Sequence, residues 1–323
     1  MKRPLRFSAA FVVLLAFCLS VAAAGADYRV TKKIPIGGEG SWDYLSIDSE
    51  ARRLYVSHGT RVEVIDLEAG KVIGQIPDTA GVHGIAIVSE YGRGYTSNGK
   101  SNNSTIFDLK TLKVLGQVET GKKPDAIIYD PASKRVFAFN GEGDSATAIN
   151  AADGKVAGTV GLGGGPEFAA ADGKGTVFVN LEEENMTVEF DSQKLKVLNK
   201  WPLAPCKTPT AMAMDRKNRR LFIGCRSQVA AIVDADTGKV VQTLPIGDHV
   251  DAAVFDQESG LVFFSNGDGT VNVIHQDSPD KYTAVQTVQT APRAKTMTLD
   301  PKTHLLYLST AENGQFEVLV VGK

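Results

Sequence analysis

Hydrophobic positions recur along this chain with a nearly constant period. A short apolar segment ends at an acidic residue six times, at Asp48, Asp130, Asp172, Asp215, Asp256 and Asp300, and Val88 takes the equivalent place in the second unit. Successive members of this series are 40, 42, 42, 43, 41 and 44 residues apart. A period of this length indicates a fold in which similar units stack on one another.

Each unit predicts four antiparallel strands. The apolar segment is followed by a second strand rich in aromatic and β-branched residues, as at 53–57, and by a third, as at 62–67. In most units a turn containing glycine, such as 68–71 or 236–239, then leads into a fourth strand. Four such strands form one blade of a β-propeller. No segment keeps apolar residues at helical spacing over the length of a helix, so we predict an all-β fold.

The last unit predicts how the ring closes. It contains only three strands before the chain ends at Lys323, whereas residues 28–36 precede the first unit and have the pattern of a fourth strand. We therefore predict one seven-bladed β-propeller domain over residues 27–323, in which the N-terminal strand completes the last blade. This closure leaves no open sheet edge for aggregation and fastens the two ends of the chain together.

The first 26 residues have the pattern of a signal peptide. Three basic residues within the first six positions precede an apolar run over 11–24, and small residues follow at 24–26. The run is too short to span a bilayer, so we expect it to be cleaved and the mature chain to have no transmembrane segment. The predicted location is the periplasm or the extracellular space.

Charge argues against a nucleic-acid-binding role. Three of the 35 Lys and Arg residues and none of the 37 Asp and Glu residues lie in the predicted signal peptide, which leaves the mature chain with a net charge of −5. No run of basic residues is present that would release counterions from a nucleic acid. We expect a monomer whose partner is a cell-envelope protein or a small ligand.

Two cysteines, Cys206 and Cys225, remain in the mature chain and fall in the same predicted blade. Their spacing matches no zinc or redox motif, and the chain has no motif for covalent haem attachment. In an oxidising compartment the two thiols can form a disulfide, and two separate buried thiols are the alternative. The sequence leaves this choice open.

Strand residues 53–57 followed by 62–76, and 94–98 followed by 104–118, resemble the YVTN-repeat propellers, which include the YncE-like secreted proteins. Tyr95-Thr96-Ser97-Asn98 is the best approximation to the name-giving motif. The resemblance extends over essentially the whole mature chain. It implies a periplasmic or extracellular propeller that binds a ligand or a partner protein. Relatives by fold include lactonases and a streptogramin lyase.

Propeller geometry predicts which side chains meet at one mouth of the central channel. The innermost strand of each blade starts at this face, and the second strand ends there. Starts of innermost strands contribute Trp42, Asp43, His83, Asp125, Glu167, His249, Asp251, Arg293 and Lys295. Ends of second strands contribute His58, Asn98, Asn140, Asn180 and Asn266.

The residues predicted at this mouth offer carboxylates, imidazoles and a guanidinium to a ligand. The predicted ligand-binding residues are Asp43, His83, Asp125, Glu167, His249, Asp251 and Arg293. Carboxylates are the oxygen ligands that Ca²⁺ or Mg²⁺ prefers, and Asp125 and Glu167 are the first candidates. The histidines have the chemistry of general bases, and Arg293 that of a clamp for an anionic group. The alternative is that these polar residues only satisfy the backbone of turns.

The sequence favours two candidate functions. The first is a binding module that uses the channel mouth, with no cofactor other than calcium or magnesium in view. The second is a metal-assisted lactonase or lyase at the same mouth, for which the sequence assigns no catalytic residue. A serine hydrolase is disfavoured because the chain has no G-x-S-x-G nucleophile elbow.

Overall fold

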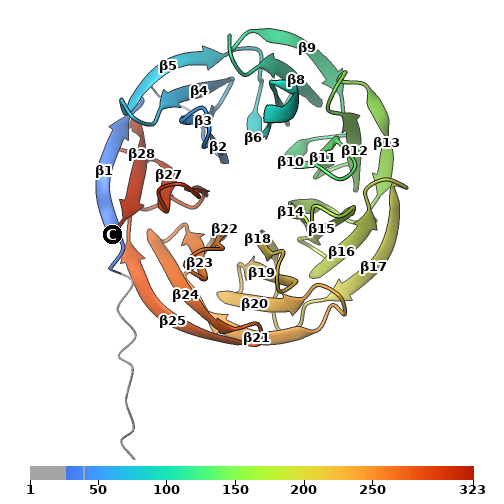
Figure 1. The fold of residues 1–323 in the computed structure, drawn as a ribbon, viewed down its shortest axis with the longest axis vertical. Helices are drawn as coiled ribbons and strands as arrows, with labels where there is room; N and C mark the ends of the chain where they lie inside the picture. Colours follow the sequence, from blue (N-terminus) through green and yellow to red (C-terminus); the bar gives the residue numbers. More distant parts are fainter. Residues whose placement is uncertain (1–26, 39–40) are drawn as a thin grey trace, which may run out of the picture.

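The computed structural model describes residues 27–38 and 41–323, which form a ring of seven four-stranded antiparallel sheets around a central channel (Figure 1). The predicted all-β, seven-bladed architecture is confirmed. Within the described residues, helix is confined to one 3₁₀ turn, η1 (Ser89–Tyr91). None of the helices in these ranges is long and apolar enough to cross a membrane. The predicted signal peptide, residues 1–26, lies outside the described residues.

Each blade runs from the channel outwards in chain order, and the strands of blades 1 to 4 have the following bounds. Blade 1 contains β2 (Leu45–Asp48), β3 (Arg53–His58), β4 (Arg61–Asp66) and β5 (Lys71–Ile76). Blade 2 contains β6 (Val82–Val88), β7 (Arg93–Asn98), β8 (Asn103–Asp108) and β9 (Val114–Glu119). Blade 3 contains β10 (Pro124–Asp130), β11 (Arg135–Asn140), β12 (Ser145–Asn150) and β13 (Val156–Gly161). Blade 4 contains β14 (Pro166–Ala171), β15 (Thr176–Leu181), β16 (Met186–Asp191) and β17 (Lys196–Pro202).

Blades 5 to 7 complete the ring. Blade 5 contains β18 (Pro209–Asp215), β19 (Arg220–Cys225), β20 (Val229–Asp234) and β21 (Val240–Pro245). Blade 6 contains β22 (Val250–Asp256), β23 (Leu261–Asn266), β24 (Thr270–Ser278) and β25 (Lys281–Gln289). Blade 7 contains β26 (Met297–Asp300), β27 (Leu305–Glu312), β28 (Gln315–Gly322) and, as its outermost strand, β1 (Arg29–Pro35).

The N-terminal strand closes the ring as predicted. β1 pairs antiparallel with β28 and places Ile34 opposite Val318, where Ile34 is buried in the core between blades 7 and 1. Just before β1, the ring of Tyr28 packs edge-on against Phe263 of blade 6, with ring centroids 5.0 Å apart. The first residues of the described chain therefore join the last blade and also contact the blade before it.

The hydrophobic core is divided among the interfaces between blades. Seven clusters of buried side chains are found in the described residues, and each one joins two adjacent blades around the ring. The second and third strands of each blade supply most of these side chains because both faces of a middle strand are covered by neighbouring blades. Each blade is thus stabilised by its neighbours, as in other repeat folds.

The acidic residue that marks the repeat links neighbouring blades. Asp300 at the end of β26 accepts hydrogen bonds from Arg52 Nη1 at 2.6 Å and from Ser49 Oγ at 2.8 Å, both in blade 1. Four further blade pairs use the same device: Ser192 to Asp130 at 2.6 Å, Arg219 to Asp172 at 3.2 Å, Gln276 to Asp215 at 3.0 Å, and His304 to Asp256 at 2.8 Å. The recurrence seen in the sequence therefore has a structural cause at the face opposite the predicted mouth.

Cys206 and Cys225 form a disulfide, with their Cα atoms 5.7 Å apart. It joins the segment between β17 and β18 to the end of β19, and both residues are buried. Of the two alternatives left open by the sequence, the structure contains the bridge.

Candidate ligand site at the channel mouth

The second residue of the innermost segment of each blade lies at the same mouth of the channel. These seven positions, which we call the inner ring, are Asp43, His83, Asp125, Glu167, Thr210, Asp251 and Lys295. In five blades the register with the neighbouring strand shifts immediately after the first strand residue, as between Pro124 and Ile127. Such a bulge turns a neighbouring side chain out of the strand's regular alternation between the two faces of the sheet. In these five blades the bulge lies beside the inner-ring residue.

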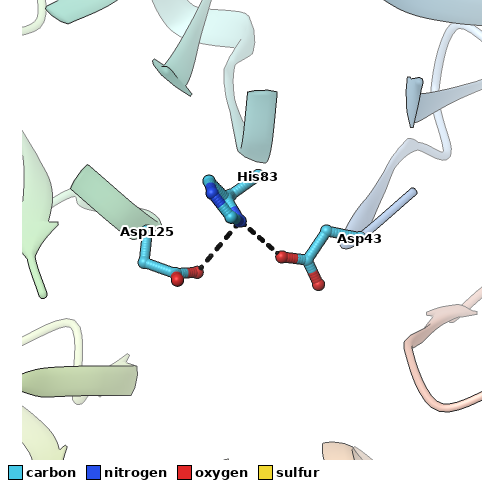
Figure 2. A group of neighbouring side chains, drawn as sticks. All are labelled: Asp43, His83 and Asp125. Carbon is cyan, nitrogen blue, oxygen red and sulfur yellow. Dashed lines mark hydrogen bonds and ion pairs between the residues drawn. The ribbon is translucent and has the colours of Figure 1, made fainter. Parts of the chain in front are cut away.

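Three inner-ring residues from consecutive blades are in direct contact. His83 Nδ1 lies 2.7 Å from Asp43 Oδ2 and 3.6 Å from Asp125 Oδ1, so the imidazole stands between two carboxylates (Figure 2). Burial alone would lower the pKa of His83, but the hydrogen bond with Asp43 and the charge of Asp125 raise it above its ordinary value. We call Asp43, His83 and Asp125 the triad.

The two carboxylates of the triad are poorly compensated. Burial and the negative charge of Asp43 raise the pKa of Asp125 to about 7, although His83 acts in the opposite direction. Asp43 Oδ1 is buried and has no hydrogen-bond partner in the described part of the chain. In the same ranges no Lys or Arg forms an ion pair with either Asp43 or Asp125.

The next inner-ring residue, Glu167, has a different partner. Burial, the charge of Asp125 and a hydrogen bond with Glu182 raise the pKa of Glu167 to about 10, so this carboxyl is protonated at neutral pH. Glu182 in turn accepts a hydrogen bond from Arg226 Nη1 at 2.6 Å. The sequence suggested Asp125 and Glu167 as metal ligands, but the structure brings Asp125 together with Asp43 and His83 instead.

Asp251 completes the inner-ring carboxylates on the other side of the channel. Its side chain is only 6% exposed and contacts the Lys295 ammonium, while Arg226 Nη2 lies 3.5 Å away. Burial raises the pKa of Asp251, and the neighbouring Lys295 only partly offsets this effect. Asp251 therefore forms ion pairs with basic side chains, whereas within the described residues no Lys or Arg forms one with Asp43 or Asp125.

Two aromatic rings form the floor beneath the inner ring. Tyr44 from blade 1 and Phe168 from blade 4 approach to 5.0 Å between ring centroids, across the channel. Burial raises the pKa of the Tyr44 phenol well above its ordinary value, and the inner-ring carboxylates Asp251, Asp43, Glu167 and Asp125 raise it further. All four inner-ring carboxyl groups therefore lie within electrostatic reach of the Tyr44 phenol.

Open space is found on both sides of this aromatic floor. On the triad side, a cavity of about 340 Å³ is lined by Trp42, Asp43, His83, Lys100 and Lys123, together with Ser41, Gly81, Val82 and Gly99. On the other side, a chamber of about 480 Å³ is lined mainly by apolar side chains of blades 3 to 7, among them Ile128, Met212, Met214, Phe255 and Leu299. The channel therefore has a charged half and an apolar half.

Two predicted site residues lie at the rim of the mouth. Arg293 and His249 directly precede the innermost segments of their blades and have left-handed backbone conformations, with φ of 66° and 56°. The Arg293 guanidinium lies 4.6 Å from the centre of the Trp42 ring, a cation–π distance. The His249 side chain is 72% exposed and pairs with Asp248 at 3.1 Å. His249 is thus directed to solvent and is not brought together with the triad.

The residues at the ends of the second strands serve the interior of the blades. Asn98 Nδ2 donates to Asn103 at 2.8 Å and to Thr105 at 2.9 Å, and Asn140, Asn180 and Asn266 have similar partners within or next to their own blades. His58 is buried against Glu63 and the ring of Phe316. These contacts, most of them to polar side chains of the same blade, hold the asparagines within the blades.

Sequence reasoning missed four residues of this site. The position that follows the inner-ring residue is Gly or Ala in four of the seven blades, but it is Tyr44 in blade 1 and Phe168 in blade 4. The aromatic character of these two residues was therefore a usable signal. Arg226 directly follows a second strand, in the region already selected, and was overlooked. Glu182 lies in an acidic turn at 182–184, and nothing in the sequence shows that this turn folds over Glu167.

No protein-family model matches this chain, and no curated protein matches its sequence. Several solved propellers have a similar fold. The WD40 repeats of RRP9 cover 92% of this chain and 97% of their own at 11% identity, with a TM-score of 0.78. A chain of a mitotic checkpoint complex covers 100% of this chain and 99% of its own at 13% identity, with a TM-score of 0.80. A chain of Kuenenia stuttgartiensis hydrazine synthase covers 87% of this chain and 95% of its own at 13% identity, with a TM-score of 0.76.

Identities this low show the fold alone. The ring of seven four-stranded sheets and these comparisons together show that this chain is a seven-bladed β-propeller with WD40-like structural neighbours.

Proposed function

We propose that this protein is a binding module that takes a small, positively charged ligand into the charged half of its channel. The observation that carries this proposal is the convergence of four inner-ring carboxyl groups, from four different blades, on the part of the channel beside Tyr44. Two of them, Asp43 and Asp125, have no Lys or Arg partner in the described ranges. A pocket that concentrates uncompensated negative charge in a desolvated place favours a cationic guest.

The rest of the mouth supports the same role. The adjoining cavity of about 340 Å³ falls within the size range of small-molecule sites and is lined by Asp43 and His83. Exposed basic residues such as Lys123 stand at the rim, where water screens them, whereas the carboxylates lie deeper. Periplasmic or secreted location and a YncE-like, YVTN-repeat family assignment belong to this proposal as well. They rest on the sequence patterns.

A thermal-shift titration of residues 27–323 tests the proposal. We expect putrescine, choline or a divalent cation to raise the melting temperature by several degrees at saturating concentration, because a ligand that binds only the folded state stabilises it by mass action. Succinate, an anion of similar size, serves as the opposite probe. The shift should be lost in Asp125→Asn and kept in Asp144→Asn, an exposed control outside the ring. Stabilisation by succinate alone, or by none of these probes, would contradict a cation-binding mouth.

Partner binding through the same surface is compatible with this role. One structural neighbour is a chain of a mitotic checkpoint complex, an assembly in which a propeller is combined with other proteins. For this chain, a cell-envelope protein that presents a Lys or Arg side chain to the mouth would use the same carboxylates. Loss of partner capture in Asp125→Asn, with capture retained in Asp144→Asn, is the expected result.

A second candidate function is a metal-assisted lactonase or lyase. It is favoured by the position of His83 between two carboxylates beside a cavity, because a positioned imidazole with a raised pKa is suited to proton transfer. The test is hydrolysis of γ-butyrolactone followed by base uptake at constant pH. Turnover that needs a divalent cation and is lost in His83→Gln would support an enzyme. Turnover unchanged by this substitution would exclude the triad from the reaction.

A further inference from the structure

We propose that the triad Asp43, His83 and Asp125 is a binding site for one divalent metal ion of the zinc type. The inference rests on the proposed function, because the ion would be one cation that the charged mouth accepts. It departs from the expectation of Ca²⁺ or Mg²⁺ at Asp125 and Glu167.

The ligand atoms are already gathered. His83 Nδ1 and one carboxylate oxygen of each aspartate all lie within 4.8 Å of one another. Zinc bound to nitrogen and oxygen ligands at about 2.0–2.2 Å requires spacings of roughly 3.0–3.6 Å between those ligands. From His83 Nδ1, the spacing of 2.7 Å to Asp43 lies just below this range, and the spacing of 3.6 Å to Asp125 lies at its upper end. Side-chain adjustments of a few tenths of an ångström to about 1 Å would complete the geometry.

The backbones that present the three ligands are held in place. The Asp43 amide donates to Ser57 Oγ at 2.7 Å, and its carbonyl accepts from Thr296 Oγ1 at 2.8 Å in blade 7. Ser97 Oγ accepts from the amide of Gly84, next to His83, and donates to the carbonyl of Asp125. One serine therefore ties the second ligand to the third. Such support lowers the reorganisation that ion binding would require.

An independent observation points to a missing positive charge. Asp43 Oδ1 is inaccessible to solvent and has no hydrogen-bond partner in the described part of the chain. Buried carboxylate oxygens are normally paired with a donor or a metal, since an unpaired one costs free energy. Two lysines act on the triad without pairing with it: Lys123, which is about half exposed and pairs with Glu142 at 3.4 Å, and Lys295, which contacts Asp251. A bound divalent ion would neutralise both aspartates.

The cavity next to the triad leaves a free coordination position. Asp43 and His83 line it together with Trp42, Lys100 and Lys123. Three protein ligands and one open position are the arrangement of reactive zinc sites, in contrast to the four-ligand sites that only support structure. A water molecule or an anionic group of a small ligand would occupy this position.

The donor set selects the type of ion. Ca²⁺ takes six to eight oxygen ligands, and Mg²⁺ binds oxygen in octahedral geometry while keeping much of its water. An imidazole nitrogen with only two carboxylates favours Zn²⁺ and its neighbours in the first transition row. Glu167 is held by Glu182 and supplies no further oxygen to the triad.

Isothermal titration of untagged, EDTA-treated residues 27–323 with ZnCl₂, MnCl₂, CaCl₂ and MgCl₂ tests this inference. We expect one Zn²⁺ per chain with a Kd in the micromolar range or below, and at least tenfold weaker binding of Ca²⁺ and Mg²⁺. His83→Gln and Asp43→Asn should each weaken Zn²⁺ binding at least tenfold. His249→Gln, which removes an exposed histidine at the same rim, should leave it unchanged.

The visible spectrum of the Co²⁺-loaded wild-type protein gives a second readout that does not depend on variants. Intense d–d bands, absent in His83→Gln, would indicate a low-coordinate nitrogen–oxygen site. Zn²⁺ binding that persists in His83→Gln, or stronger binding of Ca²⁺ than of Zn²⁺, would overturn the inference. If putrescine or choline stabilises the protein and Zn²⁺ does not bind, this inference fails while the proposed function stands. If none of these cations binds, both fail.

Discussion

At the scale of single residues, the mouth shows how one position in a repeat acquires different chemistry in each blade. Asp125 and Glu167 occupy equivalent places in blades 3 and 4, each after a proline. Asp125 lies beside the His83 imidazole, whereas Glu167 bonds to a second carboxyl group. Their pKa values, about 7 and about 10, are raised by burial first and by neighbouring carboxylates next. Equal positions therefore do not imply equal charge states.

The raised pKa of Glu167 predicts that Glu167→Gln stabilises the protein at neutral pH. A carboxyl group whose pKa is about 10 in the folded state and about 4.5 when unfolded favours folding fully below pH 4.5, and this contribution is lost as pH rises. Glutamine stays neutral and still donates to Glu182. We expect a gain of about 2 kcal/mol in the free energy of unfolding at pH 7 and no gain at pH 4.

Urea unfolding at the two pH values measures this difference. Glu183→Gln, an exposed change in the turn that carries Glu182, is the matched control and should stay within 0.5 kcal/mol of the wild type, roughly the range of surface substitutions. Equal stability of wild type and Glu167→Gln at both pH values would show that Glu167 is not held in the neutral form.

At the scale of structural elements, each blade is fastened to the next at the face opposite the mouth. The acidic residue at the end of an innermost strand receives its partner from the following blade in five of the seven interfaces. Val88 replaces it in blade 2, and Asp48 of blade 1 bonds Ala51 of its own turn at 3.0 Å. The interface of blade 7 with blade 1 matters most, because it is where the chain closes.

Removing Arg52 should weaken this closure. The Asp300 side chain is fully buried, and Arg52→Met would leave its charge with only hydroxyl and backbone donors. We expect a loss of about 3 kcal/mol in the free energy of unfolding, typical of an unpaired buried charge. Arg29→Met removes the mostly exposed pair with Asp27 and should cost less than about 0.5 kcal/mol. Thermal unfolding of both variants measures the contrast, and equal losses would contradict the role of the buried pair.

The same pair predicts a change in acid sensitivity. Burial alone would raise the pKa of Asp300, but hydrogen bonds from Arg52, Thr303 and Ser49 lower it below its ordinary value. A depressed pKa contributes stability that is present above the unfolded value, near 3.8, and is lost as pH falls further. Without Arg52 the burial effect prevails, so Arg52→Met should unfold in acid at a higher pH than the wild type. Tryptophan fluorescence followed from pH 7 to pH 2 would show the shift, and coincident curves would contradict it.

The disulfide of blade 5 is a second element-level constraint. Cys206 and Cys225 are 19 residues apart, and a disulfide that closes a loop of this size lowers the entropy of the unfolded chain, which stabilises the fold by roughly 3 kcal/mol. Reduction with dithiothreitol should therefore lower the melting temperature of the wild type. The double variant Cys206→Ala, Cys225→Ala should melt lower and be insensitive to the reductant. A reductant effect of equal size in both proteins would place its cause elsewhere.

At the scale of the whole molecule, closure of the ring depends on one short segment. β1 covers the outer edge of β28 and buries Ile34 in the cluster between blades 7 and 1. The strand also brings its preceding residue, Tyr28, onto Phe263 of blade 6. The N-terminal segment thus both completes a sheet and links two blades.

Removal of residues 27–36 should expose the edge of β28 and cause self-association. An unpaired strand edge beside apolar surface is a template for pairing with another chain. We expect a protein that starts at residue 37 to elute as oligomers in size-exclusion chromatography. A peptide of residues 27–36 added in excess should restore the monomer, and the same peptide with Ile34→Asp should not. A monodisperse monomer without any peptide would show that the ring closes without β1.

The sequence by itself determined the architecture of this protein. Local patterns repeat every 40 to 44 residues, and each unit hides its apolar faces only against similar neighbours, so the number of blades and the closing strand could be read directly. The ring of polar residues at one mouth followed from the same repeat. Equivalent positions in the repeat predict this location for Asp43, His83, Asp125, Glu167 and Asp251.

Only the tertiary structure decided which of these residues act together. Asp43 and Asp125 are 82 positions apart in the chain, yet both flank His83, because successive blades rotate equivalent residues around one axis. The fold also gave Glu167 a carboxyl partner, directed His249 to solvent, and brought Tyr44 and Phe168 together across the channel. Backbone patterns are local and repeat with the chain, whereas side-chain contacts across the channel depend on distances between distant blades that no local pattern records.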